Sequence, residues 1–403
     1  MKIYQVGGAV RDKLMNRSPQ DIDYVVVSST PEEMLNKGFK QVGKNFPVFI
    51  NPTNKCEYAL ARKEIKTGNK HTDFKFIFDE SVSLEEDLMR RDFTCNAIAL
   101  DEETSQIIDP FNGANDIKNK ILKHINSKHF IEDPLRILRM CRFAAQLNFD
   151  IAPETFLLAK QMVSDGLLKY LSPERIWQEI LKALQTNNFE LFITAAQQCG
   201  ALQQILPEIV PLFSIPENIE KHPEEAVGAH TILALKEVSQ SKPIIKFAVL
   251  VHDIGKIKTP KENISIYDDH ALNGIDIINQ ICNRLRIPNT YKKFAILCCQ
   301  YHTLFSKIKK LDSNTLIEFA DRFVKCEIND FIEVCKANYF GRLLKYDKEE
   351  FQENVEMFKL IVETLKKIKA SNIPNFNNIK KDKNIANELH KLKIDTINNL
   401  LKK

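Results

Sequence analysis

Short apolar runs with a period of two recur through the first 125 residues, separated by short helical stretches. In chain order these runs are KIYQV, YVVV, PVFI, EYALA, FKFIF, AIAL and IID. Such runs are typical of strands, because successive side chains of a strand point to opposite faces. Gly7 and Gly8 follow the first run at once, and residues 9–15 are predicted to form a short helix. We therefore expect an α+β domain with one sheet over residues 1–125.

Beyond about residue 126 the strand pattern stops, and helical periodicities separated by prolines continue to the end of the chain. We predict a helical neck and body over residues 126–215, a second helical domain over 216–345 and a helical, Lys-rich tail over 346–403. The polar, Lys-rich stretch at residues 65–73, IKTGNKHTD, is expected to be a mobile loop.

Composition indicates the general class of protein but not its function. The 403 residues are 44% hydrophobic and 27% charged, with only 12 glycines, which is typical of globular domains rich in helix. A net charge of +4 permits a nucleic-acid partner without indicating one. The nine cysteines form no CxxC pattern and are expected to be reduced, mostly buried thiols in a cytoplasmic protein. No signal peptide or membrane-spanning apolar run is predicted.

Asp21 and Asp23 stand at the start of the second apolar run. If both lie on a strand, their carboxylates share a face and repel each other unless a cation lies between them. A glycine turn nearby, Gly7-Gly8, would let backbone N–H groups approach phosphate, and Arg11 on the following helix would add a positive charge. The combination predicts a Mg²⁺-nucleotide site. Taken alone, the Asp-x-Asp is also compatible with a solvated turn, and Arg11 with a surface helix charge paired with Asp12.

GGAVRD followed by DID resembles the class II nucleotidyltransferase family, which contains the CCA-adding enzymes (tRNA nucleotidyltransferases) and bacterial poly(A) polymerases. The resemblance implies a polymerase-beta-like head domain in which Asp21 and Asp23 are catalytic and bind Mg²⁺. Gly8 and Arg11 would contact the triphosphate of ATP or CTP.

The stretch RRDFTCNA, residues 90–97, matches the same family. The match implies that Arg91 binds the nucleotide, while Asp92 and Asn96 shape the sugar pocket. Arg62 and Glu64 stand where the family carries a short Arg-x-Glu motif before a flexible loop.

In EDPLRILR, residues 132–139, we expect Asp133 to be a helix N-cap and to share a helix face with Arg136. A carboxylate can accept from the exocyclic amine of cytosine or adenine, and a guanidinium can donate to the adjacent ring atoms. Uracil and guanine present a carbonyl there instead. This stretch resembles the family's EDxxR motif, which acts as an amino-acid template for base choice, and Arg139 is expected to contact the nucleotide too. The alternative is an ordinary salt bridge, and Arg142 is expected to be structural.

Glu174, Arg175 and Glu179 match the family's neck-helix ERxxxE element. The match implies that these side chains support the template helix through ion pairs.

Histidines are concentrated in the C-terminal half: His230, the adjacent pair His252-Asp253 on an apolar helix, His270 and His302. This set resembles the HD phosphohydrolase domain and would suit Ni²⁺ or another divalent transition metal. HD proteins usually supply one more Asp from a late helix. Here the corresponding stretch offers Asn338, so Asp330 or a water is an alternative ligand.

The complete pattern resembles bacterial CCA-adding enzymes with a fused HD domain. It implies tRNA, ATP and CTP as partners, no membrane, and a monomer or homodimer. In that group the HD module is associated with 2′,3′-cyclic phosphodiesterase, 2′-nucleotidase and phosphatase activities. A poly(A) polymerase, a CC-only or A-only enzyme, and an HD phosphohydrolase whose head merely binds RNA stay open as alternatives.

Overall fold

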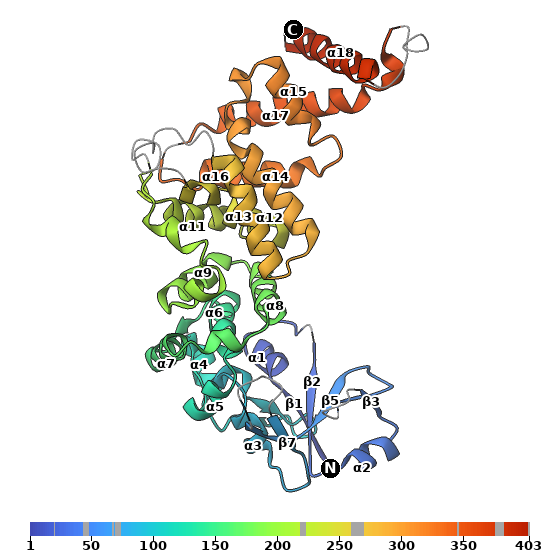
Figure 1. Ribbon diagram of the computed structural model, residues 1–403. Helices are drawn as coiled ribbons and strands as arrows, with labels where there is room; N and C mark the ends of the chain where they lie inside the picture. The colour runs from blue at the N-terminus through green and yellow to red at the C-terminus, as the bar shows by residue number, and fades with distance from the viewer. Residues whose placement is uncertain are drawn as a thin grey trace. The chain divides into compact units, whose positions relative to one another are not determined.

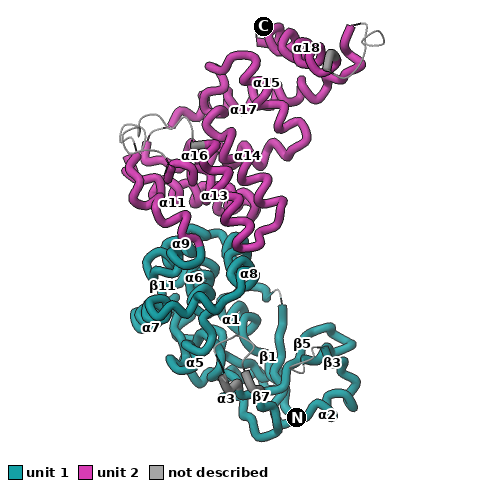
Figure 2. The backbone as a smooth tube through the Cα atoms, in the orientation of Figure 1, with its two compact units in different colours: residues 1–205 teal, residues 206–403 magenta. Residues whose placement is uncertain are grey.

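The computed structural model describes residues 1–19, 21–42, 48–66, 68, 74–217, 223–258, 270–344, 346–374 and 383–401. The chain divides into two compact units, residues 1–205 and 206–403 (Figure 2). The finer four-domain division stays a prediction. The 65–73 loop falls largely outside the described residues.

Within the described residues, unit 1 holds a seven-stranded sheet in the order β3-β4-β5-β2-β1-β8-β9 (Figure 1). Its strands are β1 (Lys2–Val6), β2 (Asp23–Val27), β3 (Lys40–Val42), β4 (Val48–Ile50), β5 (Glu57–Leu60), β8 (Ala99–Leu100) and β9 (Ile107–Ile108). The central strands β1 and β2 are antiparallel, with Val6 opposite Asp23, and β2 is parallel to β5. This register places the turn after β1 beside the start of β2.

Besides the main sheet that we expected, the described residues hold two separate strand pairs. The strands β6 (Lys63–Lys66) and β7 (Phe74–Ile77) pair with each other, and β10 (Ile121–Leu122) pairs with β11 (Asp150–Ile151). β11 also lies beyond residue 126, where we expected no strand. The sequence pattern missed β10 and β11, because these two-residue strands lie outside the runs with a period of two.

The sheet is buried on both faces, because alternate residues of β1 and β2 enter two apolar clusters. Tyr4, Val6 and Val25 belong to one cluster. Tyr24 and Val26 belong to the other, where Tyr24 stacks on Tyr58 with ring centroids 4.4 Å apart. Alternation of buried side chains on both faces fixes the register, since a slip of one residue would exchange the faces.

The remainder of unit 1 is helical. Its helices are α1 (Gly8–Leu14), α2 (Pro31–Asn36), α3 (Leu84–Met89), η1 (Thr94–Asn96), α4 (Gly113–Asn119), α5 (Ser127–Glu132), α6 (Leu135–Leu147), α7 (Pro153–Ser164), η2 (Leu167–Tyr170), α8 (Pro173–Leu184), α9 (Phe189–Gln198) and α10 (Ala201–Ile205). Ser172 caps α8 by accepting from the Arg175 N–H, and Pro173 occupies the first turn. The helix α6 packs against α8 and α9, which fixes the helix that carries Arg136 and Arg139.

All regular elements in the described part of unit 2 are helices, apart from an isolated β-bridge between Pro216 and Ala226. Its helices are η3 (Val210–Ser214), α11 (Val227–Glu237), α12 (Pro243–Val251), η4 (Ile254–Lys258), α13 (His270–Arg284), α14 (Asn289–Ser306), η6 (Ile308–Lys310), α15 (Ser313–Asp321), α16 (Ile328–Phe340), α17 (Lys348–Lys367), η7 (Ala370–Asn372) and α18 (Lys383–Leu401). The helices α11, α12, α14 and α16 pack against one another. The α+β class is thus confirmed, and no described helix is long and apolar enough to cross a membrane.

Candidate functional site

The turn between β1 and α1 brings backbone and arginine into close approach. Gly7 has a φ of 73°, a conformation that side-chain-bearing residues rarely adopt, and a Cβ there would lie 2.9 Å from Nη1 of Arg91. Gly7 therefore has two separate reasons to be glycine. The arrangement places the guanidinium of Arg91 directly over the start of α1, where unpaired helical N–H groups favour an anion.

We had expected Asp21 and Asp23 to lie on the same strand, but only Asp23 does. β2 begins at Asp23, and Asp21 precedes it. The two carboxylates still interact: burial raises the pKa of Asp23, and the charge of Asp21 raises it further, while the guanidinium of Arg91 lowers it. Asp23 thus carries a negative charge that its surroundings do not fully compensate. This is an environment in which carboxylate oxygens can hold a divalent cation.

Arg11 and Arg139 are joined by a chain of buried hydrogen bonds beneath this turn. Nη1 of Arg11 donates to Oδ1 of Asn96 (2.7 Å), and Nδ2 of Asn96 donates to Oδ1 of Asp92 (3.1 Å). Nε of Arg139 donates to Oδ2 of Asp92 (2.6 Å). Burial of Asp92 opposes ionisation, but Arg139 and Asn96 outweigh it and lower the pKa of Asp92 to about 2. Asp92 and Asn96 therefore hold the two arginines in place, with protein donors at both oxygens of Asp92.

Asp87, a residue that sequence reasoning missed, organises the adjacent arginine pair. Its side chain is fully buried; Oδ1 lies 2.7 Å from Nη2 of Arg90, and Oδ2 lies 3.3 Å from Nη2 of Arg91. The spacings of three and four residues are those of neighbours on a helix, so the pattern was present in the sequence. Asp87 also accepts from the backbone N–H of Arg62 (3.3 Å).

Asp133 and Arg136 do not share a helix face, because α6 begins at Leu135 and Asp133 stands outside it in an extended conformation. We had predicted Asp133 as the N-cap of α6, but the N-cap is Pro134, although Oδ1 of Asp133 accepts from the Leu135 N–H (3.1 Å). Oδ2 pairs with Nη2 of Arg175 at 3.0 Å. Arg136 donates to the carbonyl oxygens of His129 (2.7 Å) and Arg90 (2.5 Å). Both side chains are therefore held by the protein and not by each other.

Arg175 and Glu179 of the neck helix form ion pairs of the supporting kind that we expected. Arg175 pairs with Asp133, and Glu179 binds Arg142 with Nε 2.6 Å from Oε2, which fits a structural Arg142. Glu174 is exposed in the first turn of α8. The side chain of Glu64 lies outside the described part of the chain.

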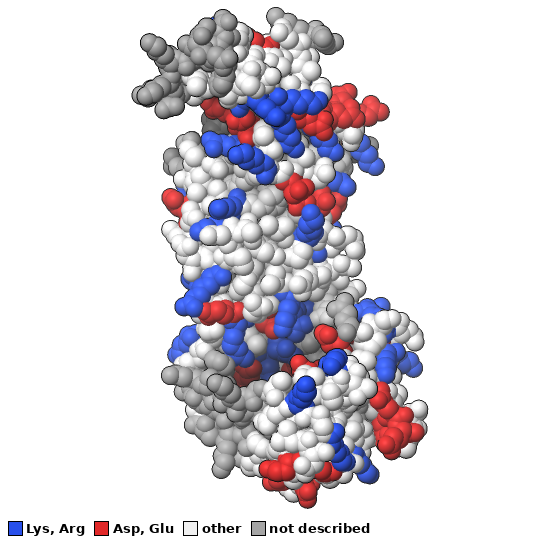
Figure 3. All heavy atoms as spheres, turned by 90° about the vertical axis from the view of Figure 1, so that its right-hand side faces the viewer, with Lys and Arg blue, Asp and Glu red and all other residues white. Residues whose placement is uncertain are grey.

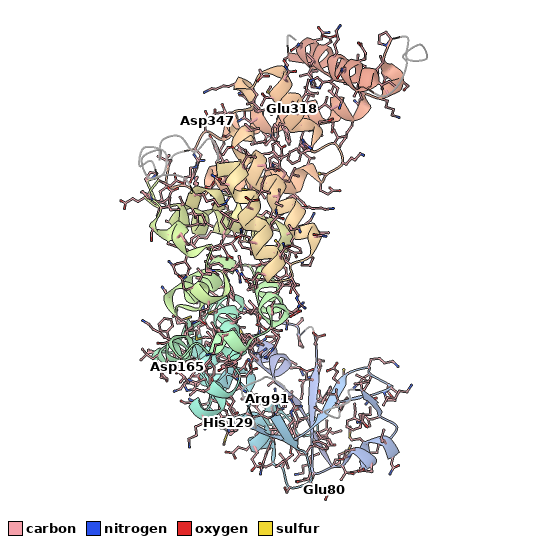
Figure 4. The ribbon with its side chains drawn as sticks, in the orientation of Figure 1. Glu80, Arg91, His129, Asp165, Glu318 and Asp347 are labelled. Carbon is pink, nitrogen blue, oxygen red and sulfur yellow. The ribbon has the colours of Figure 1, made fainter. Side chains whose placement is uncertain are left out.

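Figure 3 shows a hollow in unit 1 where Lys or Arg atoms lie close to Asp or Glu atoms. Arg91 and His129, both labelled in Figure 4, belong to unit 1, and the His129 carbonyl accepts from Arg136. The residues brought together in this region from the sheet, α1, η1 and α6 define the candidate nucleotide site.

A second candidate site lies in unit 2, formed by His230, His252, Asp253 and His302, which we call the histidine cluster. In each histidine, Nδ1 lies close to a backbone carbonyl oxygen. The distance is 3.0 Å from His230 to Gly341, 2.7 Å from His252 to Val249, and 3.0 Å from His302 to Cys298. Anchoring Nδ1 to a carbonyl orients each ring and leaves Nε2 as the metal-binding atom.

Ligand atoms of His230, His252 and Asp253 all lie within 4.8 Å of one another. The two oxygens of Asp253 lie 3.3 Å from Nε2 of His252 and of His302. Nε2 of His252 is buried without a hydrogen-bond partner among the described residues. A divalent transition metal would fit this donor set, since imidazole and carboxylate both bind such ions.

We had expected His252 and Asp253 to lie on one helix, but the helix ends before them. α12 ends at Val251, with His252 as its C-cap, so Asp253 turns back toward the neighbouring imidazole. Asp253 also contacts Nζ of Lys256 at 2.8 Å, and Lys256 binds the buried Glu217. Sequence reasoning assigned no role to Glu217 or Lys256.

Asn338 meets the histidine cluster, with Oδ1 3.1 Å from Nε2 of His230. Asp330, the alternative ligand, instead pairs with Lys242 at 2.8 Å. His270 is the first residue of α13, and its side chain lies outside the described residues.

Comparisons with known proteins agree with this layout. Residues 3–123 match the family described as "Poly A polymerase head domain", and residues 148–212 match "Probable RNA and SrmB-binding site of polymerase A". A multifunctional CCA protein of Acinetobacter baumannii is 42% identical over 383 residues, covering 93% of this chain and 92% of the relative. One from Teredinibacter turnerae is 47% identical over 323 residues, covering 79% and 78%.

Solved structures show the same fold. An apo form of a CCA-adding enzyme superposes with a TM-score of 0.68 at 21% identity, covering 98% of this chain and 87% of that one. A Thermotoga maritima CCA-adding enzyme complexed with tRNA gives a TM-score of 0.63 at 20% identity, covering 98% and 86%. Fold and site together define a nucleotidyltransferase with a helical body. The chain belongs to the family of multifunctional CCA proteins.

Proposed function

We propose that this protein adds CCA to the 3′ end of tRNA from CTP and ATP, without a nucleic-acid template. The observation that carries the proposal is the convergence of Gly7, Arg91 and Asp23 at the start of α1 and β2. The relatives named above and the Thermotoga maritima structure solved with tRNA support the choice of substrate.

Asp21 and Asp23 would hold Mg²⁺, since the two carboxylates repel each other and a bound cation would relieve that repulsion. Bound Mg²⁺ would polarise the reacting oxygens and offset the charge of the triphosphate. The residues themselves bind and orient: Arg91, the N–H groups at Gly8, and Arg11 contact the triphosphate, while Asp92 and Asn96 keep Arg11 and Arg139 in place.

Base choice would come from Asp133 and Arg136, each held by protein contacts that fix its position. A carboxylate acceptor and a guanidinium donor match cytosine and adenine and oppose a carbonyl in the same place, with about 1–3 kcal/mol of discrimination per contact. Arg136→Ala should therefore raise UTP incorporation relative to CTP. A uniformly slower enzyme with an unchanged CTP:UTP ratio would make Arg136 structural.

The decisive experiment incubates the purified protein with tRNA that ends at the discriminator base, giving each NTP alone and in pairs. Addition of C, C and A from CTP and ATP, with UTP and GTP ignored, is expected. Long A tails on unrelated RNA would identify a poly(A) polymerase. Products that stop at CC with ATP present would identify a CC-adding enzyme.

For the histidine cluster we propose a metal-dependent phosphohydrolase of 2′,3′-cyclic phosphates, acting on damaged tRNA 3′ ends. Three imidazoles are anchored through Nδ1, and two of them place Nε2 3.3 Å from an oxygen of Asp253. This donor set supports a transition-metal site for Ni²⁺, Co²⁺ or Mn²⁺. The relatives' name, multifunctional CCA protein, is compatible with a second activity.

This second proposal is tested by hydrolysis of 2′,3′-cAMP across a metal series. We expect hydrolysis only with added transition metal, and none in His252→Ala, while CCA addition by the same variant persists. If no metal supports hydrolysis in the wild-type protein and Asn338→Asp restores it, the domain is degenerate and serves structure or RNA contact.

A further inference from the structure

The aromatic ring of Phe143, on α6, lies among the arginines of the nucleotide site. The guanidinium carbons of Arg11, Arg139 and Arg142 lie over this ring, 5.5, 5.3 and 4.0 Å from its centroid. All three separations are within the range of cation–π attraction. Phe143 is 6% exposed, so these contacts are largely removed from water, where the attraction is strongest.

The local sequence explains how one ring reaches these arginines. Arg139 precedes Phe143 by four residues and shares its helix face, whereas Arg11 comes from α1. The ring's tilt is fixed from the side by Phe93, whose centroid lies 5.6 Å away at an interplanar angle of 77°. That edge-to-face contact ties the ring to RRDFT, the same segment that supplies Arg91 and Asp92.

Each guanidinium also has its own carboxylate: Arg11 pairs with Asp12, Arg139 with Asp92, and Arg142 with Glu179. Each carboxylate accepts hydrogen bonds from its guanidinium and so occupies some of the N–H donors of that guanidinium. An aromatic ring has no lone pair in its plane, and its attraction for a cation comes from the quadrupole above its face. The ring can therefore hold a guanidinium by its face, and the N–H donors at the edge of the guanidinium stay available to another acceptor.

We propose that Phe143 is a positioning residue for the bound triphosphate. Its π face holds the guanidiniums of Arg11 and Arg139 against one ring despite their like charge, so the N–H groups that bind no protein acceptor are available to phosphate oxygens. Arg142 joins the ring to α8 through Glu179. This inference rests on the proposed nucleotidyl transfer and deepens it, since it names a residue outside the motifs by which the site was found.

The test replaces Phe143 by mono-, di- and trifluorophenylalanine, a series that weakens the π face at nearly constant shape. Dissociation constants for MgCTP and MgATP are measured by calorimetry on the full chain without tRNA. We expect affinity to fall stepwise with each fluorine, by about threefold or more over the series. Equal affinity across the series would overturn the proposal, because packing alone is insensitive to fluorination.

A second pair of variants separates positioning from folding. Phe143→Leu removes the ring, and Phe192→Leu makes the same change at a fully buried ring of α9 that stacks on Phe189. Similar losses of thermal stability are expected, but only Phe143→Leu should raise KM for CTP, with kcat changed less. Equal KM effects in both variants would also overturn the proposal. Absence of nucleotide binding in the wild-type protein would instead defeat the proposed function itself.

Discussion

Oδ2 of Asp133 lies 3.0 Å from Nη2 of Arg175, a residue 42 positions later on α8. The carboxylate proposed to read the base is thus oriented by a helix that carries no other group of the nucleotide site. Nη1 of Arg175 is buried without a hydrogen-bond partner among the described residues. Arg175 therefore has a donor to spare for a ligand that reaches Asp133.

Arg175→Ala should impair base choice more than stability. The pair is partly exposed, so its loss should cost no more than about 1 kcal/mol of folding free energy. Misplacement of Asp133 should lower kcat/KM for CTP by about tenfold or more, and the CTP:UTP ratio should fall. Gln178→Ala, a change at an exposed site on the same helix, is the matched control. A large loss of stability with an unchanged nucleotide preference would show that the ion pair is only structural.

Asp23→Ala should reduce nucleotidyl transfer by at least about 10³-fold, if bound metal supplies several kcal/mol of charge stabilisation. Binding of tRNA should survive, since we expect the helical parts to hold it. Single-turnover addition of C and a gel-shift assay measure the two properties. Asp165→Ala removes an exposed carboxylate of unit 1 and should behave as wild type. Near-normal turnover of Asp23→Ala would remove the metal assignment.

Asp92 should make unit 1 sensitive to acid. Its folded pKa of about 2 lies below its ordinary value of 3.8, so its stabilising effect is complete above about pH 4. That effect disappears as the pH falls toward 2. The wild-type protein should therefore lose about 2 kcal/mol more stability than Asp92→Asn between pH 5 and pH 2.

The measurement is urea unfolding followed by fluorescence of Trp177, the single tryptophan, which is buried in α8 of unit 1. Other carboxylates titrate in both proteins, so their effects cancel in the difference. A difference between the two proteins that stays constant over this pH range would show that Asp92 is not stabilised as an anion.

Asn338→Asp should strengthen metal binding by the histidine cluster. The new carboxylate would replace an amide that lies 3.1 Å from Nε2 of His230 and would add a negative charge at the site. We expect about a tenfold gain in affinity, largest for the harder Mn²⁺ and smallest for Ni²⁺. Calorimetric titration with each metal measures it. Asp330→Asn, on the same helix but paired with Lys242, should leave affinity unchanged. Equal affinities in wild type and Asn338→Asp would place Asn338 outside the ligand set.

Local pattern determined much of this protein. The period of two located the central strands, because each buries alternate residues on opposite faces of the sheet. The turn at Gly7 was readable because few residues other than glycine fit a positive φ. Arg142 and Glu179 were expected as supports, and they form an ion pair.

Only the tertiary structure decided which side chains meet across distant segments. Sequence spacing placed Asp133 and Arg136 on one helix face, but the helix begins later, and each binds a partner from elsewhere in unit 1. The ring of Phe143 resembled any other core residue in the sequence. Its position among guanidiniums of α1 and α6 depends on long-range packing, which brings together residues that no local periodicity relates.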